Sequence, residues 1–316
     1  MRLSKRESVE LLLTESWDGV GADVLRVLGE SHHLFPLWYS QRTALWKDPV
    51  CRKAYKTQWL LNALATETVC RLVDDLESAG VEVVVLKGLP LAQRIFGDLA
   101  ARTSGDIDLL VRPCQYSLAL ETLQGNGPSS RAALLARWAF FRKQTHAFSI
   151  DSRGTQVDLH HCLRLEVSGG QQQARFWNNR EHVTLGRREV PVPSLYDTLA
   201  LLILGFHEDL AQGTARVRSA LDIKATWRSL DAQHAWSYLR DLKLDSKARA
   251  VNRVLNDCGA RLPLPVQTAE KLSFNPWFCE NPLTRRLWAL KTCDSPSRAL
   301  YRFLVGLPWR LLIHRL

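Results

Sequence analysis

The stretch from Asp106 to Val111 reads Asp-Ile-Asp-Leu-Leu-Val and is the most informative part of this sequence. Its aliphatic residues predict a β-strand, which Pro113 ends. Side chains two residues apart on a strand point to the same face, so we expect Asp106 and Asp108 to lie side by side. Two carboxylates this close repel each other unless a cation neutralises them. The stretch therefore predicts a strand that presents a cation-binding pair.

A second β-branched run precedes this strand. Residues 81–86 read Val-Glu-Val-Val-Val-Leu, which predicts a buried strand that ends at Lys87-Gly88. A helix is predicted over 89–99, with Pro90 in its first turn, where a missing N–H costs nothing. A turn of this kind lets backbone amides approach phosphate groups. We therefore expect Gly88 and Lys87 to contact a bound triphosphate.

A third carboxylate is expected from a hairpin predicted over residues 146–160, which has a short glycine-containing turn. Asp158 lies between two aliphatic residues of its second strand, where a lone buried charge would be costly. It is therefore the candidate that joins Asp106 and Asp108. His160 shares the face of Asp158 and is predicted to orient it by a hydrogen bond.

Three carboxylates at one site favour Mg²⁺, with Mn²⁺ as the alternative, because hard cations take carboxylate oxygens and often keep substrate phosphates as further ligands. In a two-metal arrangement, one ion activates an attacking hydroxyl and the other stabilises the leaving pyrophosphate. Arg102, Thr103 and Ser104 precede Asp106 and are expected to contact phosphates through charge and hydroxyl groups. The pattern points to phosphoryl or nucleotidyl transfer.

Together these residues carry a resemblance. The chain resembles a bacterial family of uncharacterised nucleotidyltransferases, within the DNA polymerase beta-like superfamily, through Leu86-Lys87-Gly88, Arg102, Asp106 to Val111, and Val157-Asp158-Leu159-His160. The resemblance covers roughly residues 80–165 and extends weakly to His207 and 218–223. In that superfamily a Gly-Ser or Gly-Gly follows the first strand, whereas here the turn is Lys87-Gly88-Leu89 and lacks the serine.

The resemblance implies an α+β fold with a small mixed sheet, the polymerase beta-like nucleotidyltransferase core. From the predicted helices and strands, we assign this core to residues 81–193, between an N-terminal helical region (1–80) and a C-terminal helical region (194–316). A long helix is predicted between Pro49 and Gly80, and its recurring apolar positions are Trp59, Ala63, Val69, Val73 and Leu76. Ser194 is the predicted N-cap of a helix over 195–209.

The resemblance also implies an activity. We expect a Mg²⁺-dependent transfer of a nucleoside monophosphate from an NTP, with ATP as the first candidate, to an acceptor hydroxyl on a small molecule or a protein, with release of pyrophosphate. Asp106, Asp108 and Asp158 would be the catalytic and metal-binding residues, and Asp158 would also take the acceptor proton. Lys87, Gly88, Arg102 and Ser104 would bind the nucleotide.

Two other functions remain open. The altered turn at Gly88 is consistent with a catalytically inactive nucleotide-binding or scaffold protein of a peptide- or polysaccharide-modifying system. The formal net charge of +10 is consistent with terminal nucleotide addition to nucleic acid. We rank nucleic acid below a small-molecule or protein acceptor, because the 42 basic residues are spread along the chain without a known binding module.

Composition excludes several classes of protein. The chain has 316 residues, of which 46% are hydrophobic and 23% charged, as in ordinary folded proteins. Seven cysteines, none spaced as CxxC, argue against a zinc knuckle or a disulfide framework and predict reduced thiols in the cytoplasm. His207-Glu208 lacks the second histidine of a zinc protease. The segment from Arg298 onward mixes basic and apolar residues, so peripheral membrane contact is an alternative to a packed C-terminal helix.

Overall fold

The computed structural model describes residues 4–15, 17, 19–124, 147–152, 155–163, 170–260, 262 and 275–291. The first residue of the predicted hairpin, its turn at 153–154 and the segment from Arg298 onward lie outside the described residues. The chain divides into two compact units, one of residues 19–198 and one that combines residues 1–18 with 199–316. Each unit is described by itself.

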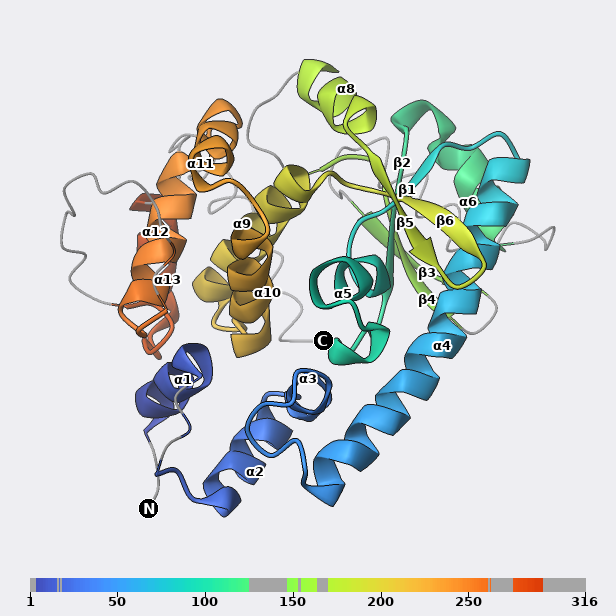
Figure 1. The fold of residues 1–316 in the computed structure, drawn as a ribbon. Helices are drawn as coiled ribbons and strands as arrows, with labels where there is room; N and C mark the ends of the chain where they lie inside the picture. Colours follow the sequence, from blue (N-terminus) through green and yellow to red (C-terminus); the bar gives the residue numbers. More distant parts are fainter. Residues whose placement is uncertain are drawn as a thin grey trace, which may run out of the picture. The chain divides into compact units, whose positions relative to one another are not determined.

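The first unit contains a four-stranded mixed sheet with the order β1-β2-β4-β3, which confirms the predicted α+β class (Figure 1). β2 pairs antiparallel with β1 and parallel with β4, and β3 and β4 form the predicted antiparallel hairpin. The strands are β1 (Val83–Val85), β2 (Ile107–Val111), β3 (Ala147–Ser152) and β4 (Thr155–His160). Every residue of β1 and β2 is buried, because the sheet lies in the main apolar core.

α4 (Pro49–Ser78) confirms the predicted long helix. Asp48 caps its start by accepting a hydrogen bond from Val50 N at 2.8 Å. The C-terminal half buries Val69, Leu72, Val73 and Leu76 in the core of the sheet.

Trp59 is one of the recurring apolar positions of this helix, yet its side chain is 51% exposed. Between Cys51 and Val69 the buried positions of α4 are instead polar, namely Gln58, Asn62 and Thr66. Asn62 is buried because its amide bonds backbone carbonyls of a distant segment, a requirement that apolar periodicity does not record.

Shorter elements complete the first unit. They are α2 (Ala22–Ser31), α3 (Phe35–Ser40), α5 (Leu89–Phe96), η1 (Leu99–Ala101), η2 (Pro113–Gln115), α6 (Tyr116–Gln124), α8 (Gly170–Asn178) and the antiparallel pair β5 (Glu181–Leu185) and β6 (Arg188–Val192). α9 (Leu195–Gln212) follows. The predicted N-cap is confirmed, because Ser194 Oγ accepts from Asp197 N at 3.1 Å.

The second unit is helical over its described residues. Its helices are α1 (Lys5–Thr14), most of α9, α10 (Val217–Arg228), α11 (Ala232–Asp241), α12 (Asp245–Asn256) and α13 (Pro282–Lys291). The buried His207 ring stacks on Trp288 with 4.7 Å between ring centroids, so it packs within the helices of this unit. Within the described part of the chain, no helix combines the length and hydropathy of a bilayer-spanning segment.

Candidate metal and nucleotide site

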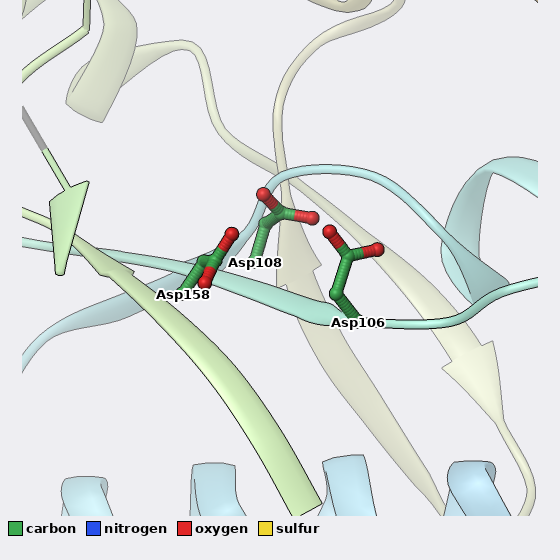
Figure 2. A group of neighbouring side chains, drawn as sticks. All are labelled: Asp106, Asp108 and Asp158. Atoms are coloured by element: carbon green, nitrogen blue, oxygen red, sulfur yellow. The ribbon is translucent and has the colours of Figure 1, made fainter. Parts of the chain in front are cut away.

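The three predicted carboxylates meet at one place in the first unit. Each of Asp106, Asp108 and Asp158 offers an oxygen, and these oxygens all lie within 4.8 Å of one another. Figure 2 shows the three carboxylates gathered on the same side of the sheet. Asp108 and Asp158 are directly opposite in the parallel pairing of β2 with β4, so the register alone fixes two of the three. Asp106 immediately precedes β2, whereas the sequence predicts it as the first residue of the strand.

Asp108 is the buried member of the cluster, with 3% of its surface exposed. Its Oδ1 lies 3.2 Å from Nε2 of His160 and its Oδ2 lies 3.2 Å from Nζ of Lys87. Burial raises the pKa of Asp108, but the hydrogen bond with His160 and the charge of Lys87 lower it by more. The net pKa is therefore below its usual value, which keeps the carboxylate ionised at neutral pH.

Lys87 is the counter-ion of this cluster. Its Nζ also lies 3.6 Å from Oδ2 of Asp106, so one ammonium contacts two of the carboxylates. Burial lowers the pKa of Lys87, and the charges of Asp108 and Asp106 raise it by more, so its pKa is above the usual value. The lysine therefore remains charged and offsets part of the carboxylate repulsion.

The donor set fits a divalent cation. Oδ2 of Asp108 is buried, and its contact with Lys87 is an ion pair of 3.2 Å. The single charge of Lys87 offsets one of the three carboxylates, which leaves a net negative charge for a cation to neutralise. With Asp106 and Asp158 beside it, the cluster offers three hard oxygen donors of the kind that Mg²⁺ prefers.

Asp158 is held by a residue that the sequence analysis missed. Ser149 lies opposite Asp158 in the β3–β4 pairing, and its Oγ donates a hydrogen bond to Oδ1 of Asp158. The hairpin register could have identified this serine, since both strands were predicted.

His160 does not contact the carboxylate that we expected. Its imidazole lies against Asp108 on the neighbouring strand, although Asp158 is on the same face of its own strand. Asp108 lies opposite Asp158, so it is a diagonal neighbour of His160 and within reach of a long side chain.

The predicted turn is formed by Gly88. Its φ of 84° and ψ of −123° suit glycine alone, and it caps the start of α5. A Cβ atom at this position would lie 2.8 Å from Oγ of Ser104. The hydroxyl of Ser104, which donates to the carbonyl of Asp106 at 3.3 Å, thus lies beside a turn whose own sequence lacks a serine.

The segment that carries Arg102 and Ser104 is anchored to α4. The amide of Asn62 donates to the carbonyl of Arg102 at 2.7 Å and to the carbonyl of Leu99. Gln58 in turn donates to Oδ1 of Asn62 at 2.8 Å. The charge of Arg102 lowers the pKa of Lys87, which places its guanidinium in the electrostatic field of the cluster.

A second anchor holds the start of this segment. Asp98 accepts hydrogen bonds from Ser40 at 2.6 Å and from Tyr55 at 3.0 Å, and its other oxygen caps η1 through Ala100 N. Burial and the bond to Asp98 raise the pKa of Tyr55 to about 12, so its hydroxyl stays protonated and donating. Nothing in the sequence pattern singled out these polar contacts.

Comparison with known proteins gives two matches. The model of a family described as uncharacterised nucleotidyltransferases matches residues 28–254. A solved structure, that of an antigenic nucleotidyltransferase-like protein from Paracoccidioides brasiliensis, is 13% identical, with a TM-score of 0.30 over 65% of this chain and 93% of the other. No curated protein matches the chain significantly. The family match spans both the carboxylate cluster and α4.

Proposed function

The chain belongs to the family of uncharacterised nucleotidyltransferases, and from this premise we propose that it moves a nucleoside monophosphate from an NTP to an acceptor hydroxyl. One observation carries the proposal: three carboxylates converge around a buried oxygen of Asp108 that no described residue hydrogen-bonds. One lysine faces three carboxylates, so the cluster keeps a net negative charge without a ligand. A divalent cation that neutralises this charge and binds a triphosphate would give the cluster a function.

Asp106, Asp108 and Asp158 would hold Mg²⁺ or Mn²⁺. When bound, the cation offsets the charge of the triphosphate and of the leaving pyrophosphate. His160 keeps Asp108 in position, and Ser149 does the same for Asp158. These neighbours fix the carboxylates before any ligand arrives, which reduces the reorganisation that binding requires.

The remaining groups of the site would bind the nucleotide. The backbone amides at the start of α5 and the hydroxyl of Ser104 converge on the turn at Gly88, where they can donate to phosphate oxygens. Lys87 and Arg102 add two positive charges, and each has a reach suited to a phosphate. ATP is our first candidate for the NTP.

The transfer balances with the groups at hand. The acceptor oxygen attacks the α-phosphorus and forms a new P–O bond, the bond between the α-phosphorus and its bridging oxygen breaks, and pyrophosphate leaves. Asp158 takes the proton of the acceptor hydroxyl, since Ser149 already fixes one of its oxygens. The acceptor that we propose is a small molecule or a protein in the cytoplasm.

Calorimetry with each NTP tests the proposal. We expect nucleotide binding to require Mg²⁺ or Mn²⁺ and to disappear in the double variant Asp106→Ala/Asp108→Ala. The matched control is Asp151→Asn, an exposed carboxylate on β3 of the same sheet that lies outside the cluster. The control should bind nucleotide as the unchanged protein does.

Either of two results would overturn the proposal. Binding that persists without a divalent cation would remove the role of the carboxylates. Absence of binding with all four NTPs and both cations would leave the cluster without a nucleotide. A bound nucleotide with no adduct on any acceptor would favour the scaffold alternative.

A further inference from the structure

The N-terminal half of α4 presents its apolar side chains to solvent. Trp59, Leu60, Leu61 and Leu64 are 51%, 59%, 55% and 70% exposed. Figure 1 shows this half of the long helix continuing past the sheet of its unit. Four large hydrophobic residues are thus exposed within two turns of one helix, and clusters of this kind on folded proteins mark interaction sites.

The reason that apolar side chains are exposed and polar ones are buried lies in the same helix. The inner side of this half is polar because Asn62 and Gln58 hold the segment that leads to Asp106. The apolar side chains therefore contribute nothing to the core of the unit, whose apolar contacts come from the C-terminal half of α4. Exposure of these apolar side chains to water is unfavourable for the isolated unit. A role in binding a partner would account for their exposure.

The patch lies on a stripe with opposite charges at its two ends. Lys56, Leu60, Leu64 and Glu67 follow spacings of four, four and three, which places them on one face of α4. Lys56 is exposed, and the Glu67 side chain is 68% exposed, with an ion pair of 3.4 Å to the exposed Arg187. We call these four residues the α4 stripe. It is about three turns long.

This arrangement is complementary to itself. A two-fold axis near position 62 would place Leu60 of one copy against Leu64 of the other, and Lys56 against Glu67, twice each. Both pairs are centred within one residue of that position, so one axis serves both. Two-fold contacts use the same patch on both subunits, and require this pairing of a residue with its symmetry partner.

We propose that the α4 stripe is the interface of a homodimer, in which two α4 helices pack antiparallel. Trp59 and Leu61 flank the leucines and widen the apolar centre. An anionic membrane fits the stripe less well, because it would attract Lys56 and repel Glu67. An acidic or a basic partner protein meets the same conflict at one end of the stripe.

Sedimentation velocity of the full chain, over a range of concentrations, tests the interface. We expect a concentration-dependent dimer. Lys56→Glu and Glu67→Lys should each raise the dissociation constant about tenfold, because each places two like-charged pairs across the axis. The double variant Lys56→Glu/Glu67→Lys restores opposite charges, and should return the constant to within about threefold of the original.

A second pair of variants isolates the apolar centre. Leu60→Glu/Leu64→Glu should give a monomer, whereas Leu118→Glu, on α6 and itself 44% exposed, should leave the dimer intact. All changed side chains are exposed, and an unchanged thermal unfolding transition checks that each variant is folded. A monomer at every concentration, a dimer that survives Leu60→Glu/Leu64→Glu, or charge swaps without mutual rescue would each overturn the proposal. Binding of a monomer to phosphatidylglycerol vesicles through the stripe would assign the face to lipid instead.

Discussion

Asn62→Ala should destabilise the first unit and weaken nucleotide binding at the same time. Asn62 is 1% exposed and makes three hydrogen bonds: two donated to the carbonyls of Leu99 and Arg102, and one accepted from Gln58. It is the link between α4 and the segment that carries Arg102 and Ser104. Alanine removes all three bonds without introducing a new group.

The expected magnitude follows from these contacts. A net contribution of about 1 kcal/mol for each of the three hydrogen bonds, plus a penalty of about 1–3 kcal/mol for the amide left unpaired on Gln58, gives a loss of about 4–6 kcal/mol. Gln58→Ala removes one of the three bonds and should lose about 1 kcal/mol. Both residues lie on the same buried side of α4, so Gln58→Ala is the matched comparison.

Asn62→Ala should affect the binding of nucleotide and of Mn²⁺ to different extents. We expect nucleotide affinity to fall about tenfold in Asn62→Ala, because the phosphate contacts from Arg102 and Ser104 lose their anchor and about 1.4 kcal/mol of binding. Mn²⁺ affinity should fall less, since Asp108 and Asp158 are positioned by paired strands. Urea unfolding measures the stability, and calorimetry measures the two affinities.

A variant with unchanged stability would show that the Asn62 bonds contribute nothing to the fold. A destabilised variant with unchanged nucleotide affinity would show that the segment from Leu99 to Ser104 does not bind phosphate. Equal losses of Mn²⁺ and nucleotide affinity would contradict the separate anchoring of the two halves of the site.

Three further predictions follow from single residues. Lys87→Met should tighten Mn²⁺ binding, measured by electron paramagnetic resonance, because the competing ammonium is gone. Nucleotide affinity, measured by calorimetry, should fall. Weaker Mn²⁺ binding with tighter nucleotide binding would refute the role of Lys87 as a phosphate contact. Gly88→Ala should weaken nucleotide binding, because its positive φ and a nearby serine hydroxyl exclude a Cβ; Gly80→Ala, also at positive φ but with no neighbour within 4 Å, should only lower the urea midpoint. Asp48→Ala should cost about 1 kcal/mol at pH 7 through the lost helix cap. The hydrogen bond from Arg26 lowers the pKa of Asp48, so this difference is complete above about pH 5 and should vanish as the pH falls through the lowered value. A pH-independent difference would contradict this.

The strands and the carboxylates could be predicted because their signals are local. Val83 to Val85 and Ile107 to Val111 are short aliphatic runs, and each became a fully buried strand. Asp108 and Asp158 stand out because a charge between aliphatic residues is costly without a partner. The parallel register of β2 and β4, which places them opposite each other, depends on pairing between distant segments and was not visible.

The polar supports of the site could not be predicted from pattern. Asn62 bonds backbone carbonyls, and Asp98 bonds side-chain hydroxyls, of residues that are adjacent to them only after folding. Apolar periodicity identified α4, but it does not show that the side of the helix that bears Asn62 must face a distant segment. The partner of His160 was wrong for the same reason, since a diagonal contact depends on strand order. The three-region division of the chain stays a prediction.

Titration of the metal-free protein with Mn²⁺, followed by electron paramagnetic resonance, tests the central claim most directly. We predict saturable binding that Asp108→Asn weakens at least about a hundredfold, because loss of a direct ligand should exceed the effect of losing an outer contact. Asp151→Asn should bind Mn²⁺ as the unchanged protein does. The absence of saturable binding, or binding that Asp108→Asn leaves unchanged, would contradict the assignment of the three carboxylates as a metal site.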